Sequence, residues 1–482
     1  MKKTNKNIKA VMAVVALFVV FSVAVGVFMA ARNTFAPADS TSDGNQPSAS
    51  EQADFQQEDS VPQDNTESDN SSENGESEQQ PDVTAQPTAE PEIRPTAQPA
   101  ATSVPLPTQQ PQQDPSAVNS SMYSAMWISY LEFQSVDFST QSSFTADMEK
   151  IFADCSDMGI KTVIVQVRPF GDALYDSDIF PTSHLITGTQ GDRLQYDPLE
   201  EMVKIAHGKG LRIEAWVNPY RVRLHGKLPD NISEDNPARD ESLVFNVGGG
   251  VYYNPALEQV QDMVVKGIEE IVQNYDVDGI HLDDYFYNEN ADMSYDSADY
   301  AASGSQLSQE DWRRENVNTL VRKIYKAIKD TDSSVTFGIS PQGNNDNNYH
   351  IQYSDVCLWM REEGYVDYIM PQLYWGFGYL TSSGREDYQF VRLTEQWAAY
   401  PRHSGVKLYI GMGAYRIGAG DGGANDQSEW SSGNNLMKMV NALAANGDIS
   451  GFGLYRYDNL FRNSEYADLA KSEVEHLAEI LE

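Results

Sequence analysis

Residues 279–287 read GIHLDDYFY, a short apolar run that ends in two adjacent aspartates and is followed by three aromatic residues. An apolar run of this length with polar residues directly after it is typical of a buried strand in a parallel sheet. Because side chains alternate along a strand, we expect Asp283 to share the side of His281 and Asp284 to begin the following loop. The stretch therefore predicts a buried strand with two carboxylates at its end.

The same kind of run occurs eight times after residue 121, and each run is followed by a stretch with helical period. The runs are Met126–Leu131, Thr162–Val167, Arg212–Val217, Gly279–Leu282, Val335–Ile339, Tyr368–Leu373, Lys407–Met412 and Gly451–Leu454. The helical stretches are Phe144–Met158, Pro198–Lys209, Pro255–Tyr275, Gln309–Asp330, Gln352–Glu363, Tyr388–Tyr400, Asn434–Asn446 and Glu465–Leu481. Alternating strands and helices pair in parallel through right-handed crossovers, and eight such units close a barrel. We therefore predict an α/β fold in which residues 121–482 form a (β/α)8 TIM barrel.

Two dipeptides indicate where helices begin. Asp197-Pro198 and Asn254-Pro255 each combine an N-cap residue with a proline, which is favoured at the first helical position. The segments after the third and fourth runs are long, and loops on that side of a barrel carry its chemistry. These features predict functional loops after the third and fourth strands.

The N-terminus has the composition of a membrane anchor. Lysines at positions 2, 3, 6 and 9 precede an apolar run from Ala10 to Ala31, which is long enough to span a bilayer as a helix. We expect residues 1–32 to be an uncleaved signal-anchor, with the basic end cytoplasmic and the rest of the chain outside. The expected localisation is the cell membrane, single-pass, with an extracellular catalytic domain. Cleavage near Ala30 and Ala31, followed by secretion, is the alternative.

Residues 33–120 are dominated by Ser, Gln, Pro, Thr, Asp and Glu, and Arg94 is their only basic residue. Without periodic apolar positions this segment cannot bury a core, so we predict a disordered acidic linker. The formal net charge of the whole chain is −37. Phosphate binding requires clustered Lys and Arg, so this charge argues against nucleic acid as a partner. The expected partners are the membrane, through the N-terminal helix, and a substrate.

The residues at the ends of the predicted strands share one chemistry. They are Glu132, Gln166, Arg168, Glu214, Trp216, Asn218, Asp283, Asp284, Tyr285, Gln372, Tyr374, Trp375, Tyr415 and Arg416. Aromatic rings with hydrogen-bonding amides suit a sugar, which has apolar C–H faces and a belt of hydroxyls. Cleavage of a glycosidic bond needs carboxylates, one to donate a proton and one to attack or stabilise the oxocarbenium-like centre. The pattern indicates a polysaccharide-cleaving site.

Other chemistries lack the residues that they need. The 7 histidines are scattered and only His281 lies near a predicted strand end, so we expect no metal, no cofactor and no metal-dependent deacetylase. Cys155 and Cys357 lie on different predicted helices without metal-ligand spacing. The clusters at 344–348 and 421–426 contain calcium-type ligands, but loops rich in Asn, Asp and Gly usually form turns.

Five motifs occur in order along the predicted barrel. They are VQVRPFGDALY at 165–175, EAWVNPYRV at 214–222, DGIHLDDYFY at 278–287, MPQLYWGF at 370–377 and GFGLYRYDNL at 451–460. In these motifs the chain resembles the bacterial glycosyl-hydrolase-like family 10, formerly a domain of unknown function, over residues 126–457. The resemblance implies a TIM-type barrel, glycoside hydrolysis and, for some members, bacterial cell-wall glycan as the suspected substrate.

The fourth-strand motif is also similar to the chitinase pattern Asp-Gly-x-Asp-x-Asp-x-Glu. Asp278 and Gly279 match this pattern, and Asp283 matches its last aspartate. His281 replaces the earlier aspartate, and Tyr285 stands where the acidic glutamate belongs. The proton donor must therefore be Asp284 or come from another strand.

The motifs and the resemblance together imply a glycoside hydrolase that cleaves a peptidoglycan-type or other N-acetylhexosamine-containing polysaccharide. We expect Asp283 to act as nucleophile or to orient a substrate N-acetyl group. We expect Asp284 to act as general acid, or to raise the proton affinity of Asp283 by its charge. Glu132 and Glu214 are reserve acids. The expected substrate-binding residues are Arg168, Trp216, Asn218, Tyr285, Gln372, Tyr374, Trp375, Tyr415 and Arg416.

Several of these assignments have alternatives. Glu214 lies early in its strand and could be a paired core carboxylate, whereas Arg168 could be a structural partner of Asp172 or Glu214. His281 fits a hydrogen-bonded barrel histidine better than a catalyst. For the whole domain, the alternative is a catalytically silent glycan-binding or envelope scaffold module, in which the strand-end acids need not converge.

Overall fold

The computed structural model describes residues 122–193, 195–228, 231–424 and 428–481. The predicted signal-anchor at 1–32 and the predicted linker at 33–120 lie outside these residues. Within the described ranges, no helix combines the length and the apolar character that a membrane span requires.

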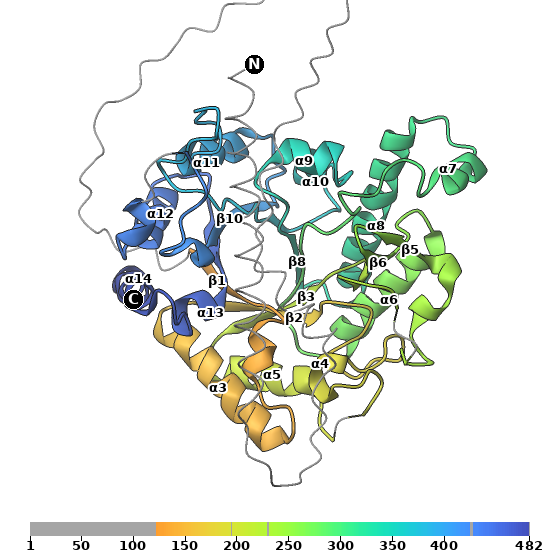
Figure 1. Cartoon of the computed structure of the whole chain (residues 1–482), viewed down its shortest axis with the longest axis horizontal. Coiled ribbons are helices and arrows are strands. Elements are labelled where there is room, and N and C mark those ends of the chain that lie inside the picture. Colours follow the sequence, from red (N-terminus) through yellow and green to blue (C-terminus); the bar gives the residue numbers. More distant parts are fainter. Residues whose placement is uncertain (1–121, 194, 229–230, 425–427, 482) are drawn as a thin grey trace, which may run out of the picture. The chain divides into compact units, whose positions relative to one another are not determined.

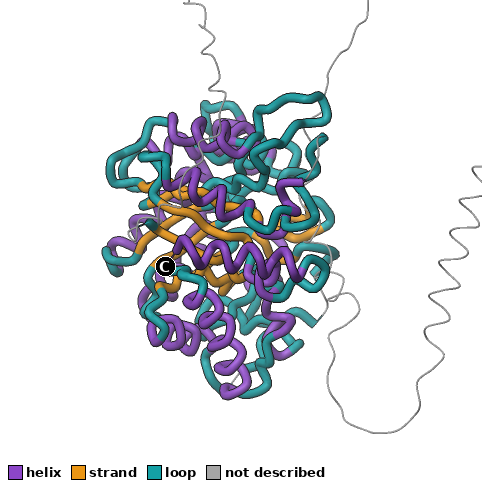
Figure 2. Tube along the Cα trace, turned by 90° about the vertical axis from the view of Figure 1, so that its left-hand side faces the viewer, coloured by secondary structure: helices purple, strands orange, loops and turns teal. Residues whose placement is uncertain are grey.

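Eight parallel strands close a barrel in the described part of the chain, in the order β1-β11-β10-β9-β8-β7-β3-β2. They are β1 (Tyr123–Ile128), β2 (Thr162–Arg168), β3 (Arg212–Val217), β7 (Gly279–Leu282), β8 (Thr336–Ile339), β9 (Tyr368–Ile369), β10 (Lys407–Gly413) and β11 (Gly451–Tyr455). Figure 1 shows these strands at the centre of the domain with helices around them, and Figure 2 shows the same arrangement from the side. The predicted (β/α)8 barrel is confirmed.

Helices follow the barrel strands along the chain and cover the outside of the barrel. The main ones are α3 (Gln141–Asp157), α5 (Pro198–Gly208), α6 (Glu258–Asn274), α8 (Gln309–Thr331), α10 (Val356–Arg361), α11 (Phe390–Ala399), α12 (Asn435–Ala444) and α14 (Ala467–Leu481). Shorter helices are α4 (His184–Thr187), α7 (Ser297–Ser303), α9 (Asn345–His350), α13 (Tyr457–Phe461), η2 (Glu132–Ser135), η3 (Pro237–Arg239), η4 (Glu241–Leu243), η5 (Ala414–Arg416) and η6 (Ser428–Ser431). The loop after β3 adds a small antiparallel sheet of β4 (Arg221–Arg223), β5 (Val244–Val247) and β6 (Gly250–Tyr253), in the order β4-β6-β5.

One of the two predicted helix starts is correct and one is wrong. The Asp197 side chain accepts hydrogen bonds from the backbone N–H groups of Leu199 and Glu200, as an N-cap does. The side chain of Asn254 instead accepts from the backbone N–H of Ala256 and donates to Asp299. Because this local bond holds a turn, α6 begins only at Glu258.

The inside of the barrel is filled by rings that face glycines. Trp127 and Tyr368 belong to an inner cluster with Ala125, Ile164, Trp216 and Met370, separate from the apolar layer under the helices. A Cβ atom at Gly338 would lie 1.8 Å from the Tyr368 ring, and one at Gly453 would lie 2.7 Å from Trp127. The glycines therefore make room for the rings, so the barrel is a packed core and its chemistry is confined to its mouth.

Arg313 of α8 anchors the long loop that follows β7. Its guanidinium forms two hydrogen bonds with the Asp296 carboxylate, of 2.8 and 2.6 Å, and donates to two backbone carbonyl oxygens of the same loop. The rings of Tyr287 and Tyr353 lie 4.8 and 4.9 Å from the guanidinium carbon. A fully buried ion pair with every charge satisfied fixes this loop to the helix layer.

The first predicted strand was placed several residues too late, because β1 ends at Ile128 and the chain turns into η2. Glu132 makes this turn. Its Oε2 accepts from the N–H and the hydroxyl of Ser129, and its Oε1 accepts from Arg456 Nε at 2.9 Å and from the N–H of Asp458. The carboxylate therefore connects the end of β1 to the end of β11.

We predict that Glu132→Gln destabilises the domain. The substitution keeps the shape of the side chain but leaves the buried Arg456 guanidinium without its carboxylate, a change that typically costs about 3 kcal/mol of unfolding free energy. Urea unfolding followed by tryptophan fluorescence measures the loss. The control is Glu149→Gln on the exposed face of α3, and equal midpoints for the two variants would contradict the role given to Glu132.

Candidate active site

Asp283 follows β7 and is held by a residue of the neighbouring strand β3 and by the residue directly after that strand. The indole Nε1 of Trp216 donates to Asp283 Oδ2 at 3.1 Å, and the Asn218 amide donates to the same oxygen at 3.1 Å. The backbone N–H of Tyr285 donates to Oδ1 at 3.4 Å. Strands β3 and β7 pair in parallel, with Trp216 beside His281. Asp283 and Asn218, which follow these strands, therefore lie at the same end of the barrel. The carboxylate is buried, and these donors fix its position.

Asp284 points to a different set of partners. Gln372, just after β9, donates to Asp284 Oδ1 at 3.2 Å, and Gln352 donates to Oδ2 at 3.4 Å. The two adjacent carboxylates are thus bound on opposite sides, Asp283 by β3 and Asp284 by the β8 and β9 loops. This divergence agrees with the alternation expected from the sequence.

Burial raises the pKa of both aspartates. The pKa of Asp283 rises to about 7, because of burial first and the charge of Asp284 second, while Arg221 opposes the shift. Burial also raises the pKa of Asp284, and the amides of Gln352 and Gln372 counteract part of the increase. Since both shifts are upward, the pair retains a proton closer to neutral pH than ordinary aspartates do. That is the protonation state which a general acid requires.

Arg221 belongs to this site although the sequence reasoning did not select it. Its backbone N–H donates to the Asn218 side chain at 3.1 Å, and its Nε donates to the Pro169 carbonyl at 3.0 Å. The guanidinium carbon lies 5.1 Å from the ring centres of both Phe170 and Tyr285. The sequence feature that could have identified Arg221 as a site residue is its position in the motif EAWVNPYRV, three residues after Asn218.

Aromatic rings gather on the β9–β11 side of the mouth. Tyr374 stacks on Tyr455 with ring centres 5.8 Å apart, and Tyr415 meets Tyr374 edge-on at 5.5 Å. Trp375 packs beside Tyr388 at 5.1 Å. These rings are half-buried and so keep surface for a ligand. The structure therefore brings the predicted residues Tyr374, Trp375 and Tyr415 to the same side as Gln372.

Trp216 and Asn218 are placed differently from the sequence expectation. Trp216 was expected to stack on sugar and Asn218 to bind hydroxyls, but both are buried and donate to Asp283. Arg416 is also buried, and its Nε donates to the Tyr374 carbonyl at 3.0 Å. These three residues position other site groups. Tyr285 retains 37% of its surface and remains available to a ligand.

Arg168 ends β2 and turns into the layer under the helices, although it stays close enough to Asp283 for the two charges to interact. A β-bulge after Gln166 pairs Arg168 with Val217, which belongs to the layer under the helices. The buried guanidinium donates to the Pro219 carbonyl at 3.3 Å and lies 4.4 Å from the Phe180 ring centre. Simple alternation had placed Arg168 on the face of Gln166, and the extra residue of the bulge reverses that side.

The two reserve acids are both committed to protein partners. Glu132 connects strand ends, as described above. Glu214 accepts hydrogen bonds from the hydroxyls of Tyr123 and Tyr368, at 3.0 and 2.5 Å, inside the barrel. Burial raises the pKa of Glu214 to about 7. His281 Nδ1 lies 2.7 Å from the Tyr368 hydroxyl, so Glu214 and His281 form a polar core network beneath the aspartates.

The clusters with calcium-type ligands are occupied by protein contacts. Asn344 caps α9 by accepting from the Asp346 N–H. Asp421 accepts from the N–H of Gly376 and from the indole of Trp430. Among the residues that the structure describes, no group of three or more His, Cys, Asp or Glu side chains is arranged to hold a metal ion.

A closed (β/α)8 barrel that gathers carboxylates, amides and aromatic rings at one mouth is the arrangement that a glycoside hydrolase requires. The chain matches the family described as Glycosyl hydrolase-like 10 over residues 123–432, and it belongs to this family. Membership confirms the resemblance seen in the five motifs.

Two curated relatives share the hydrolase description. The chain is 33% identical over 359 residues to the glycosyl hydrolase DigH of Escherichia coli (strain K12), covering 68% of this chain and 79% of that protein. It is 38% identical over 288 residues to the glycosyl hydrolase YngK of Bacillus subtilis (strain 168), covering 56% of this chain and 55% of that protein. The match thus spans about half the length of the Bacillus relative.

Solved structures resemble the chain more distantly. The glycoside hydrolase domain of PgaB (BpsB) from Bordetella bronchiseptica has a TM-score of 0.48 and 10% identity, covering 73% of this chain and 99% of that domain. A likeness of this size adds nothing to the assignment.

We predict that Asp283 makes stability fall as the pH rises. The folded carboxyl, with its pKa raised to about 7, holds a proton that the unfolded chain releases near pH 4, so unfolding becomes easier through this window. Asp283→Asn should make the fall between pH 5 and 7 shallower, by at most about 1.4 kcal/mol per pH unit. Urea unfolding at each pH measures the slope. The exposed Asp157→Asn serves as control, and an unchanged slope in Asp283→Asn would refute the shift.

Proposed function

We propose that this protein hydrolyses a cell-wall, peptidoglycan-type polysaccharide or another glycan that contains N-acetylhexosamine. The observation that carries the proposal is the Asp283–Asp284 pair at the end of β7, with each carboxylate held by its own donors. A glycosidase needs two carboxyl groups in different roles, and different environments are what separate the roles.

Asp284 is the proposed general acid. Its pKa is raised by burial, and it faces the amide of Gln372 and the aromatic side of the mouth. In the first step its proton passes to the glycosidic oxygen, so the leaving sugar departs as a neutral alcohol. Since Tyr285 occupies the position where chitinases carry glutamate, the proton must come from another carboxyl, and Asp284 is the one assigned this role.

Asp283 is the proposed partner of the substrate N-acetyl group. Both of its oxygens accept hydrogen bonds from β3 or from the following loop, and it is only 3% exposed, which hinders direct attack on a sugar carbon. A carboxylate held in this way can accept the acetamido N–H. The acetyl oxygen then attacks the anomeric carbon, and water later opens the cyclic intermediate, with Asp284 taking a proton from it.

The substrate class follows from the surroundings of the pair. Tyr285, Tyr374 and Trp375 offer ring faces to the apolar side of sugar rings, and Gln372 offers an amide to hydroxyl or acetamido groups. The formal net charge of −37 disfavours polyanions such as teichoic acid. A neutral or weakly charged glycan strand is therefore the proposed substrate.

The proposed location is the outer face of the cell membrane. The support is the sequence alone: lysines at positions 2, 3, 6 and 9 precede the apolar run from Ala10 to Ala31, and the acidic segment at 33–120 follows. A tether of this kind would let the barrel reach glycan strands at a distance from the membrane.

Substitution of the two aspartates tests the mechanism. We predict that Asp283→Asn and Asp284→Asn each lower the rate on polymeric glycan by about a thousandfold. On an aryl N-acetylhexosaminide, whose leaving group needs no proton, Asp284→Asn should keep most of the rate of aryl release in the first turnover, and Asp283→Asn should not. Release of reducing ends from peptide-free wall glycan, with mass spectrometry of the products, gives both rates and the bond cleaved.

Asp157→Asn is the matched control for these two variants. If the wild-type protein releases no reducing ends from wall glycan with or without its peptides, the substrate assignment fails. Binding of glycan without any turnover would favour the silent glycan-binding alternative. Equal losses on polymer and aryl glycoside for both variants would contradict the separate roles.

Membrane attachment has its own test. In cells that express the full chain, we predict that the protein sediments with membranes and is released by detergent but not by high salt. Removal of residues 1–32, with a cleavable secretion signal in their place, should move the activity to the medium. If cells that express the full chain release a shortened form of it into the medium, the result would support cleavage near Ala30 and Ala31 instead.

A further inference from the structure

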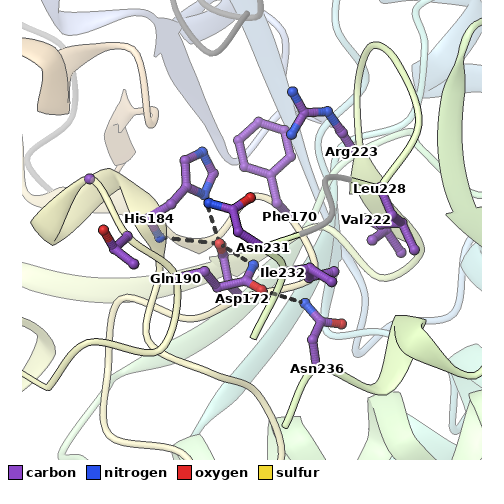
Figure 3. A pocket seen from close by; sticks show the side chains of 12 residues that line it. Phe170, Asp172, His184, Gln190, Val222, Arg223, Leu228, Asn231, Ile232 and Asn236 are labelled. Carbon is purple, nitrogen blue, oxygen red and sulfur yellow. Dashed lines mark hydrogen bonds and ion pairs between the residues drawn. The ribbon is translucent and has the colours of Figure 1, made fainter. Parts of the chain in front are cut away.

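A pocket lies between the loop after β2, helix α4 and the loop after β4. It is a shallow pocket, partly enclosed and partly open to solvent. Figure 3 shows its lining, which consists of Phe170, Asp172, His184, Gly188, Thr189, Gln190, Val222, Arg223, Leu228, Asn231, Ile232 and Asn236. The mechanism proposed above uses none of these residues.

The polar groups of this pocket are held in place before any ligand binds. The buried Asp172 carboxylate accepts from His184 Nδ1 at 2.8 Å and from Gln190 Nε2 at 2.9 Å. Gln190 in turn accepts from the Asn236 amide at 3.1 Å, and Asn236 also donates to the Gly171 carbonyl. Figure 3 shows His184 and Gln190 converging on Asp172. Such a network reduces the side-chain entropy that binding would otherwise cost.

The other side of the pocket is apolar. Leu228 and Ile232 are half-buried on this side and lie over the buried Phe170 and Val222. The half-buried His184 imidazole and Gln190 amide lie on the other side, so one wall is apolar and the other polar. This combination suits a sugar unit, whose C–H face packs on apolar groups while its hydroxyls exchange hydrogen bonds. Arg223 and His184 share the pocket with the single carboxylate of Asp172, so the pocket is less acidic than the domain as a whole.

The pocket is connected to the proposed catalytic pair through Arg221. The Arg221 guanidinium lies 5.1 Å from the ring of Phe170, in the pocket wall, and 5.1 Å from the ring of Tyr285, two residues after Asp283. Val222 of the pocket directly follows Arg221 in β4. A glycan strand lying over Tyr285 would therefore pass into this pocket on the side opposite to Tyr374 and Tyr455.

We propose that this pocket is a distal sugar-binding subsite, which holds a unit of the same glycan chain away from the bond that is cleaved. The inference rests on the proposed function, because it assigns the pocket to that reaction. A distal subsite makes long chains better substrates than short ones and places the cleaved bond within the chain. The protein would then act as an endo-hydrolase.

Thr189→Tyr tests the subsite by filling the pocket from its rim. Blocking a distal subsite removes binding that the ground state and the transition state share, so the KM for long chains should rise about tenfold with little change in kcat. Rates on a short aryl glycoside should stay equal to those of the wild type. Asn231→Ala, which removes one amide from the wall, should produce a smaller change in the same direction.

Ser333→Tyr is the matched control, since Ser333 is exposed in the turn before β8, at the opposite end of the barrel. If Thr189→Tyr and the control have the same KM for long chains, the subsite is refuted while the proposed function stands. A wild-type protein that cleaves no glycan refutes the proposed function and the subsite with it. Calorimetric titration of a long glycan fragment into Asp283→Asn, with and without Thr189→Tyr, measures the binding directly, and equal affinities would refute the subsite.

Discussion

The hydrogen bonds from Trp216 and Asn218 to Asp283 are the interaction on which the rest of the site depends. A carboxylate buried beside another carboxylate is unstable unless donors surround it. Strand β3 supplies these donors, and its pairing with β7 brings Trp216 level with His281 and so places the donors opposite Asp283. The Asn218 side chain also accepts a hydrogen bond from the Arg221 N–H. The Arg221 guanidinium in turn lies over the ring of Tyr285, so the same contacts also position Tyr285.

Beneath Asp283, the polar groups inside the barrel are also held by hydrogen bonds to one another. Trp127 Nε1 donates to His281 Nε2 at 3.3 Å, and burial lowers the pKa of His281 to about 3. The imidazole is therefore neutral and carries its proton on Nδ1, which faces the Tyr368 hydroxyl. Tyr368 donates to Glu214. A continuous chain of bonds thus joins the barrel core to the strand that bears Asp283, with each donor matched to an acceptor.

The regular parts of the fold could be read from the sequence, and the irregular parts could not. Alternation between apolar runs and helical stretches predicted the closed barrel, and the alternation of side chains separated Asp283 from Asp284. Arg168 was misplaced because a bulge adds one residue to β2, and Glu132 because η2 ends β1 early. Both irregularities depend on partners distant in sequence, such as Val217 and Arg456, which local patterns do not report.

The anchoring of the loop after β7 by Arg313 has a consequence for how a ligand would be received. The loop that carries Tyr285 is tied to α8 by the bonds between Arg313 and Asp296 and by the rings on either side of the guanidinium. Because the loop is held in place before binding, it loses little conformational entropy when a ligand binds. This side of the barrel mouth is therefore a rigid surface and does not close over the ligand. Most of the conformational entropy lost on binding would then be lost by the flexible glycan, which must adopt a conformation that fits the existing surface of the protein.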